Sequence, residues 1–320
     1  MKLRIRKKIK VNTKVKGYIL GAIAAAAYGT NPLFTLPLYA EGMHPDSVLF
    51  FRYLFAIPIL GLMLRQRGRS FRIGKGEAVP MIILGIVFAL SSLTLFQSYN
   101  YMDAGIASTI LFVYPILVAV IMAVIFKERL GISTLICLLM AVGGIGLLYK
   151  AGDGTTLSLT GTLLVIASST SYAIYIVAIN KTSLKDVATL KVTFYVVLVG
   201  WIMFAARALM SEGGIQTPPT DKWWLWLCLI ALAVFPTAIS LGCTTGAIQY
   251  IGSTPTAILG ALEPVTAVFF GVTIFGEQLT PRIILGFVMI ITAVSIVVAG
   301  GKITAPLVRF RKMFPRIKRK

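Results

Sequence analysis

Two charged side chains lie inside otherwise apolar stretches of this chain and could do chemistry there. Glu263 is the one acidic residue deep in such a stretch, and Arg52 lies in another. A carboxylate in apolar surroundings can take up a proton or meet an amine, and a guanidinium pairs with a carboxylate. The structural alternatives are that Glu263 bonds backbone groups freed by Pro264 and that Arg52 extends its head towards water. The sequence leaves both alternatives open.

Hydroxyl and amide side chains recur in the same apolar stretches. Unpaired polar groups are costly in lipid, so we expect these side chains to face a shared interior, where they bind a ligand or one another. The candidates for contact with a small-molecule substrate are Glu263, Arg52, Tyr28, Asn31, Gln97, Tyr101, Tyr172, Tyr175, Thr244 and Gln249.

Residues suited to metal binding or catalysis are scarce. The three cysteines, Cys137, Cys228 and Cys243, lie at unrelated spacings in apolar stretches, and the single histidine, His44, lies in a short polar connection. Intramembrane catalysis needs paired acids, a histidine cluster or a serine with a base. The nucleotide-binding P-loop motif is absent from the sequence. We therefore expect no metal, no cofactor and no enzymatic activity.

The composition indicates that lipid surrounds most of the chain. Hydrophobic residues make up 57% of the 320 residues and charged residues 13%, whereas soluble domains are about one quarter charged. The basic N-terminal segment and the apolar residues 17–27 that follow it resemble a cleaved signal peptide. The apolar stretch continues to Tyr39, however, so we expect it to be retained as the first span. Stretches long enough to cross a bilayer predict an all-α membrane protein with ten transmembrane helices, at 17–39, 45–64, 78–100, 104–126, 131–149, 158–180, 187–207, 223–247, 252–275 and 281–299.

The basic residues predict the orientation of these spans. Basic tails at 1–16 and 301–320 carry eight Lys or Arg residues each. Together with the loops predicted on the same side of the membrane, they hold 26 of the 31 Lys and Arg residues, and the loops on the other side hold four. Cytoplasmic loops are the ones enriched in Lys and Arg, so both termini are predicted to be cytoplasmic. Such tails suit an anionic membrane face. Since no nucleic-acid-binding module accompanies the net charge of +20, we expect membrane lipid rather than nucleic acid as the partner.

The chain also resembles itself at a shift of 149 residues. The matched pairs are Pro115 and Pro264, Phe126 and Phe275, Glu128 and Glu277, and Leu130 and Leu279. At a shift of 144, Tyr28 matches Tyr172. We divide the chain into five-helix halves at 17–150 and 156–300. Because five is odd, the second half is predicted to be inverted, an arrangement typical of transporters that bind at the midplane.

The paired segments at 107–130 and 254–279, together with the sequence FRYLFA at 51–56, resemble the EamA-type members of the drug/metabolite transporter superfamily. The resemblance covers about 17–299. It implies ten helices in two inverted five-helix repeats, and export or exchange of amino acids and related metabolites. One departure from the internal symmetry is that Tyr114 stands where the second half has Glu263.

The function that we expect is secondary transport of small metabolites by alternating access, in a bacterial inner membrane. Phosphate-rich ligands need several basic contacts, and the spans hold few, so amino acids or related near-neutral compounds are favoured. The alternative is a flippase for lipids or lipid-linked headgroups that uses the same helix cavity. The sequence gives no indication of the oligomeric state.

Overall fold

Only helices and their connections form the part of the chain that this computed structural model describes, which is residues 2–127, 132–149, 158–211, 214–251, 256 and 259–296. In chain order, the helices are α1 (Lys2–Gly29), α2 (Asn31–Ala40), α3 (Pro45–Gln66), α4 (Ala78–Ser98), α5 (Ala104–Leu111), α6 (Tyr114–Phe126), α7 (Ile132–Tyr149), α8 (Leu159–Lys181), the 3₁₀ turn η1 (Ser183–Asp186), α9 (Thr189–Met210), α10 (Trp224–Ala233), the π-helix η2 (Val234–Ile239), α11 (Ser240–Ile251), α13 (Leu262–Phe275) and a last helix, Pro281–Ile296.

Seven helical segments within these ranges are long and apolar enough to cross a membrane, and three shorter apolar helices accompany them. Large apolar side chains are exposed on the outside of the bundle, among them Ile82, Val124, Leu139 and Phe269. In water such a surface would drive association, whereas lipid accommodates it. The chain is therefore an integral membrane protein.

The helix boundaries follow the predicted ones closely in several places and depart from them in others. The predicted span 45–64 is α3, and 158–180 is α8. The predicted span 17–39 corresponds to the single apolar segment Lys14–Ala40, but its helix is interrupted at Thr30, where α1 ends at Gly29 and α2 begins at Asn31. α1 also extends back to Lys2 into the predicted basic tail. The predicted C-terminal tail lies outside the described residues.

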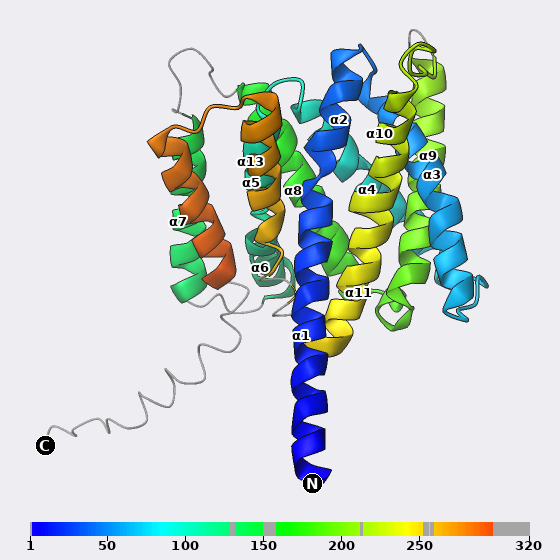
Figure 1. Cartoon of the computed structure of the whole chain (residues 1–320), viewed down its shortest axis with the longest axis vertical. Helices are drawn as coiled ribbons and strands as arrows, with labels where there is room; N and C mark the ends of the chain where they lie inside the picture. The colour runs from blue at the N-terminus through cyan, green and yellow to red at the C-terminus, as the bar shows by residue number, and fades with distance from the viewer. Residues whose placement is uncertain are drawn as a thin grey trace, which may run out of the picture.

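The helices stand side by side and form one bundle (Figure 1). We call the lower end in this view, where α1 enters, the N-terminal end, and the upper end the distal end. The principal packing pairs are α1 with α11, α4 with α8, α3 with α9, and α5 with α13. Large buried side chains such as Tyr53, Phe96, Phe112 and Phe204 fill the interior between them.

α6 and α13 end in the same way. Lys127 follows α6 with a φ of 55°, and Gly276 follows α13 with a φ of 70°, so each helix stops at a left-handed residue. This conformation closes helix ends and favours glycine. The two residues are 149 positions apart, which is the shift that relates the two halves of the sequence.

Candidate functional site

The first span breaks in its interior, at Thr30. The Thr30 hydroxyl donates a hydrogen bond to the carbonyl oxygen of Ala27 at 2.7 Å, and the Asn31 side-chain amide donates to that of Tyr28 at 2.9 Å. Pro32 occupies the first turn of α2, where its missing N–H does no harm. The short polar side chains thus add hydrogen bonds to carbonyl groups at the interruption of the helix.

Three other spans are irregular at proline residues. α5 gives way to α6 just before Pro115, Pro236 lies within the π-helix η2, and α13 begins with Glu263 and Pro264 in its first turn. Proline removes a backbone donor and disrupts the regular ladder. Irregular backbone within a membrane protein is tolerated where it is buried in protein or lines a polar cavity.

Glu263 lies directly against the end of α1. A Cβ atom placed on Gly29 would be 2.5 Å from the carbonyl oxygen of Glu263, so the two backbones touch. The Glu263 side chain is half-buried, and its charge acts on the hydroxyls of Tyr28, Tyr114 and Tyr172. Phenol groups from α1, α6 and α8 therefore lie within the electrostatic range of this one carboxylate.

Two of these tyrosines, Tyr114 and Tyr172, form an aromatic cluster with their neighbours. The rings of Tyr114 and Tyr172 meet edge to face, with centroids 4.8 Å apart. Tyr175 stacks on Tyr172 at 6.0 Å and lies 5.0 Å from Phe88 of α4. The cluster therefore joins α4 and α6 of the first half of the chain to α8 of the second half.

Arg52 is buried, with 5% of its surface exposed, so its side chain does not extend to water. Its Nε donates to the Thr237 hydroxyl at 3.3 Å, and its guanidinium lies 5.2 Å from the ring centroid of Phe96. A guanidinium has five N–H donors. Among the described residues, Arg52 makes this one hydrogen bond and no ion pair, which leaves capacity for an anion.

Tyr28 connects the two charged residues. The charges of both Glu263 and Arg52 act on its hydroxyl, and both act on Tyr99 as well. One phenol thus lies within the electrostatic reach of an acid from α13 and a base from α3. We call the set of Arg52, Glu263, Tyr28, Tyr114 and Tyr172 the central cluster.

The remaining candidate residues lie at several depths. Asn31 is 2% exposed, and within the described structure its Oδ1 has no hydrogen-bond partner. Gln97 is half-buried near the end of α4, and Thr244 is half-buried in α11. Tyr101 is half exposed in the turn after α4, beside Gly161 at the distal end and away from the central cluster. Gln249 belongs to α11, but its side chain lies outside the described part.

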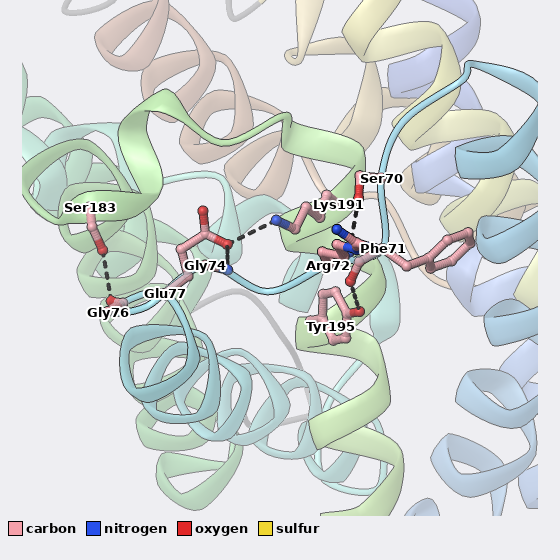
Figure 2. Close-up of polar contacts among 9 residues, drawn as sticks. All are labelled: Ser70, Phe71, Arg72, Gly74, Gly76, Glu77, Ser183, Lys191 and Tyr195. Atoms are coloured by element: carbon pink, nitrogen blue, oxygen red, sulfur yellow. Dashed lines mark hydrogen bonds and ion pairs between the residues drawn. The ribbon is translucent and has the colours of Figure 1, made fainter.

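A polar clasp joins the two halves at the N-terminal end (Figure 2). Lys191 pairs with Glu77 at 2.8 Å, and the same carboxylate accepts a hydrogen bond from the Gly74 backbone at 2.8 Å. These contacts hold the pKa of Glu77 below its usual range, the Lys191 bond first. Tyr195 and Ser183 donate to carbonyl oxygens of the same loop. The loop at 66–77 is therefore fastened to the segment at 183–195.

A second polar clasp joins the halves at the distal end. Arg207 binds Asp46 through two hydrogen bonds, of 2.7 and 3.3 Å. Lys222 pairs with Glu41 at 2.6 Å, and Glu41 raises the pKa of this lysine. The Gln216 side chain accepts a hydrogen bond from the His44 backbone at 2.7 Å. The turn at 41–47 is therefore fastened to Arg207 of α9 and to the loop at 214–222.

Neither clasp was predicted from the sequence, because each joins residues more than 100 positions apart. The hydrogen bond between Thr237 and Arg52 was not predicted either. A hydroxyl beside Pro236 in an apolar stretch was the available signal. Within the described residues, no group of three or more His, Cys, Asp or Glu side chains could hold a metal ion.

Comparison with known proteins adds a family match. Residues 15–150 and 159–299 both match the EamA-like transporter family. An uncharacterized transporter, YcbK, of Bacillus subtilis is 23% identical, with 87% of this chain and 91% of YcbK covered. An uncharacterized transporter of Archaeoglobus fulgidus is 28% identical, with 86% and 93% covered.

Two further likenesses agree with this match. The uncharacterized inner membrane transporter YicL of Salmonella typhimurium is 26% identical, with 88% of this chain and 95% of YicL covered. A crystal structure of a protein, 19% identical, superposes with a TM-score of 0.65 over 91% of this chain and 98% of its own. At that identity, the superposition bears on the fold alone.

Proposed function

This chain belongs to the EamA-like transporter family, so it is a transporter and not an enzyme, and we propose that it is a secondary carrier of small near-neutral metabolites. Amino acids and related compounds are the favoured substrates, moved by export or exchange. The observation that carries this proposal is the pair of opposite charges, Arg52 and Glu263, that both act on Tyr28 in the bundle interior.

The two charges suit a zwitterionic substrate. A substrate carboxylate would use the guanidinium donors of Arg52 that the described residues leave free, and a substrate ammonium would meet Glu263. Charge-assisted hydrogen bonds contribute about 1.5–3 kcal/mol each. Tyr28, on whose hydroxyl both charges act, would contact the body of the substrate. The pair of opposite charges thus favours amino acids over phosphate-rich ligands.

We also propose that the protein comprises ten transmembrane helices in two inverted five-helix repeats. Seven long and three short apolar segments supply that number of spans. The packing pairs support the inversion. A two-fold axis in the membrane plane would exchange the packed pair α1 and α11 with the packed pair α8 and α4. The same axis would relate α3 to α9, and α5 to α13, within each of these packed pairs. Inverted repeats place the binding site between the halves.

The clasps support alternating access. Under a shift of about 145 residues, the turn at 41–47 corresponds to 183–195, and the loop at 66–77 to 211–222. The two clasps are therefore symmetry equivalents at opposite ends of the bundle. A carrier that opens to one side at a time must break contacts between its halves at that side. We propose that each clasp yields when its own end opens.

The proposed orientation places both termini in the cytoplasm. The basis is the distribution of Lys and Arg, with 26 of 31 on the side of the termini. The N-terminal clasp would then face the cytoplasm, and the distal clasp would face the outside.

Counterflow of labelled neutral amino acids in proteoliposomes tests the proposed function. Arg52→Gln and Glu263→Gln should each lower substrate affinity by about 10- to 150-fold, which corresponds to about 1.4–3 kcal/mol. Lys14→Gln and Arg65→Gln remove exposed charges outside the central cluster and outside both clasps and should leave affinity unchanged. Unchanged counterflow in both central variants would overturn the proposal. Transfer of labelled lipid headgroups without amino-acid counterflow would instead favour the flippase.

A further inference from the structure

A separate cavity lies near the distal end, between α5, α13 and the last helix. Its volume is about 250 Å³, and its lining includes Asp103, Thr109, Val268, Glu277 and Phe287. Glu263 is in the first turn of α13, whereas Glu277 follows the end of that helix. Fourteen helical residues span about 21 Å. The distal cavity is therefore distinct from the central cluster.

Glu277 closes the start of α5 from the other half of the chain. Its carboxylate accepts hydrogen bonds from the backbone N–H of Ala104 at 2.9 Å and of Gly105 at 3.3 Å. This position is the N-terminal end of a helix, where a carboxylate is favoured. Asp103 occupies the N-cap position itself, yet its side chain makes no cap hydrogen bond. Glu277 has taken that role, and Asp103 is left to line the cavity.

Two carboxylic acids, Asp103 and Glu277, line the cavity, and no basic side chain is among its described lining residues. Burial raises the pKa of Asp103, and burial together with Asp103 raises that of Glu277 to about 7. No basic side chain in the described ranges offsets either shift. A bound cation would lower the cost of holding these carboxylates ionised.

The rest of the lining is apolar and reaches the outer surface of the bundle. Leu279, Ile284 and Val288 line the cavity and are 43%, 48% and 51% exposed. In a membrane protein these side chains face lipid, so the cavity opens sideways towards acyl chains. A ligand that complements both parts carries a positive head and an apolar tail. A hydrophilic cation would leave the apolar lining uncovered, and an anion would be repelled.

We propose that the distal cavity binds an amphiphilic cation, with its ammonium head at Asp103 and its alkyl chain against Phe287 and Val288. The site is additional to the central cluster and does not depend on what that cluster transports.

The test measures binding of decyltrimethylammonium, well below its micelle concentration, to the purified full chain in phosphatidylcholine nanodiscs by calorimetry. Asp103→Asn should weaken binding at least tenfold, because the head loses its charge partner. The matched variant Asp186→Asn, at an exposed site of η1, should leave binding unchanged. Val288→Trp, which fills the rim of the cavity, should weaken binding as well. Asp103 makes no side-chain hydrogen bond among the described residues, so its variant should fold, and a melting curve checks this.

Tetramethylammonium, which has the head without the tail, should bind at least tenfold more weakly than decyltrimethylammonium. Equal affinity of Asp103→Asn and the unaltered protein would overturn the proposal, as would equal affinity of the two ammonium probes. Glu263→Gln should retain decyltrimethylammonium binding even where amino-acid counterflow is lost. The two proposals therefore fail independently.

Discussion

Gly29 is the point where α1 touches α13, and its replacement by alanine should separate the two helices at the central cluster. A Cβ atom there would lie 2.5 Å from the Glu263 carbonyl oxygen and 2.7 Å from the Thr266 Cβ. Both neighbours belong to the first turns of α13. Ordinary contact begins near 3.4 Å, so α1 and α13 must move apart by about 0.9 Å. Overpacking of this kind costs about 1–3 kcal/mol.

The matched control is Gly146→Ala. Gly146 lies in α7, and a Cβ atom there would meet nothing within 4 Å. A glycine that adopts an ordinary helical conformation gains about 0.4–1 kcal/mol on change to alanine. The two substitutions add the same methyl group, so their difference isolates the contact between α1 and α13.

Thermal unfolding and counterflow measure the effect of Gly29→Ala. Domains of moderate size lose about 2–4 °C of melting temperature per kcal/mol, so this variant should melt at least about 2 °C below Gly146→Ala. A displacement of about 1 Å at a binding site can reduce activity by about 100-fold, so its counterflow rate should fall at least about tenfold. If Gly29→Ala and Gly146→Ala have equal melting temperatures and rates, the contact between Gly29 and Glu263 does not position the central cluster.

Two further predictions concern the ends of the bundle. The folded-state pKa of Glu277 is about 7, above its ordinary value of 4.5. Between these two pH values, the folded chain keeps a proton that the unfolded chain loses. The free energy of unfolding should therefore fall as pH rises from about 4.5 to about 7. Glu277→Gln should flatten melting temperature against pH over that window, and an unchanged slope would contradict the assignment. In the N-terminal clasp, Glu77→Gln and Lys191→Gln should each slow counterflow, and the double variant should be no slower than the worse single one, because both remove one contact. Additive losses would show that the pair does not act as a unit.

The sequence predicted the membrane class and several helix limits because these depend on local composition. The 22 residues of α3 are apolar throughout, and Pro58 within it does not interrupt the helix. Pro32, in contrast, lies in the first turn of α2, directly after the break between α1 and α2. A proline at a helix start and a proline within a helix look alike in sequence. Neighbouring helices decide which of them produces a break.

The candidate site was only partly predictable from sequence, because its geometry depends on contacts between distant segments. Glu263 and Arg52 are conspicuous as charges in apolar stretches, but the sequence could not tell whether Arg52 reached water. The bond to Thr237 joins residues 185 positions apart. In the sequence, Glu277 is recognisable only as the counterpart of Glu128, whereas its contact with α5 follows from the packing of α5 on α13. Tyr101, one of the candidates for substrate contact, lies beside Gly161 and apart from the central cluster.

The inverted repeat is the claim on which the proposed site and its gating depend, and cysteine labelling tests it most directly. Lys127 and Gln278 are exposed residues that follow the equivalent helices α6 and α13. After replacement of the three native cysteines by alanine, Lys127→Cys and Gln278→Cys are exposed in turn to a membrane-impermeant maleimide on intact cells. If the two halves are inverted, Gln278→Cys is labelled from outside and Lys127→Cys is labelled only after the cells are opened. Labelling of both from the same side would contradict the inverted arrangement.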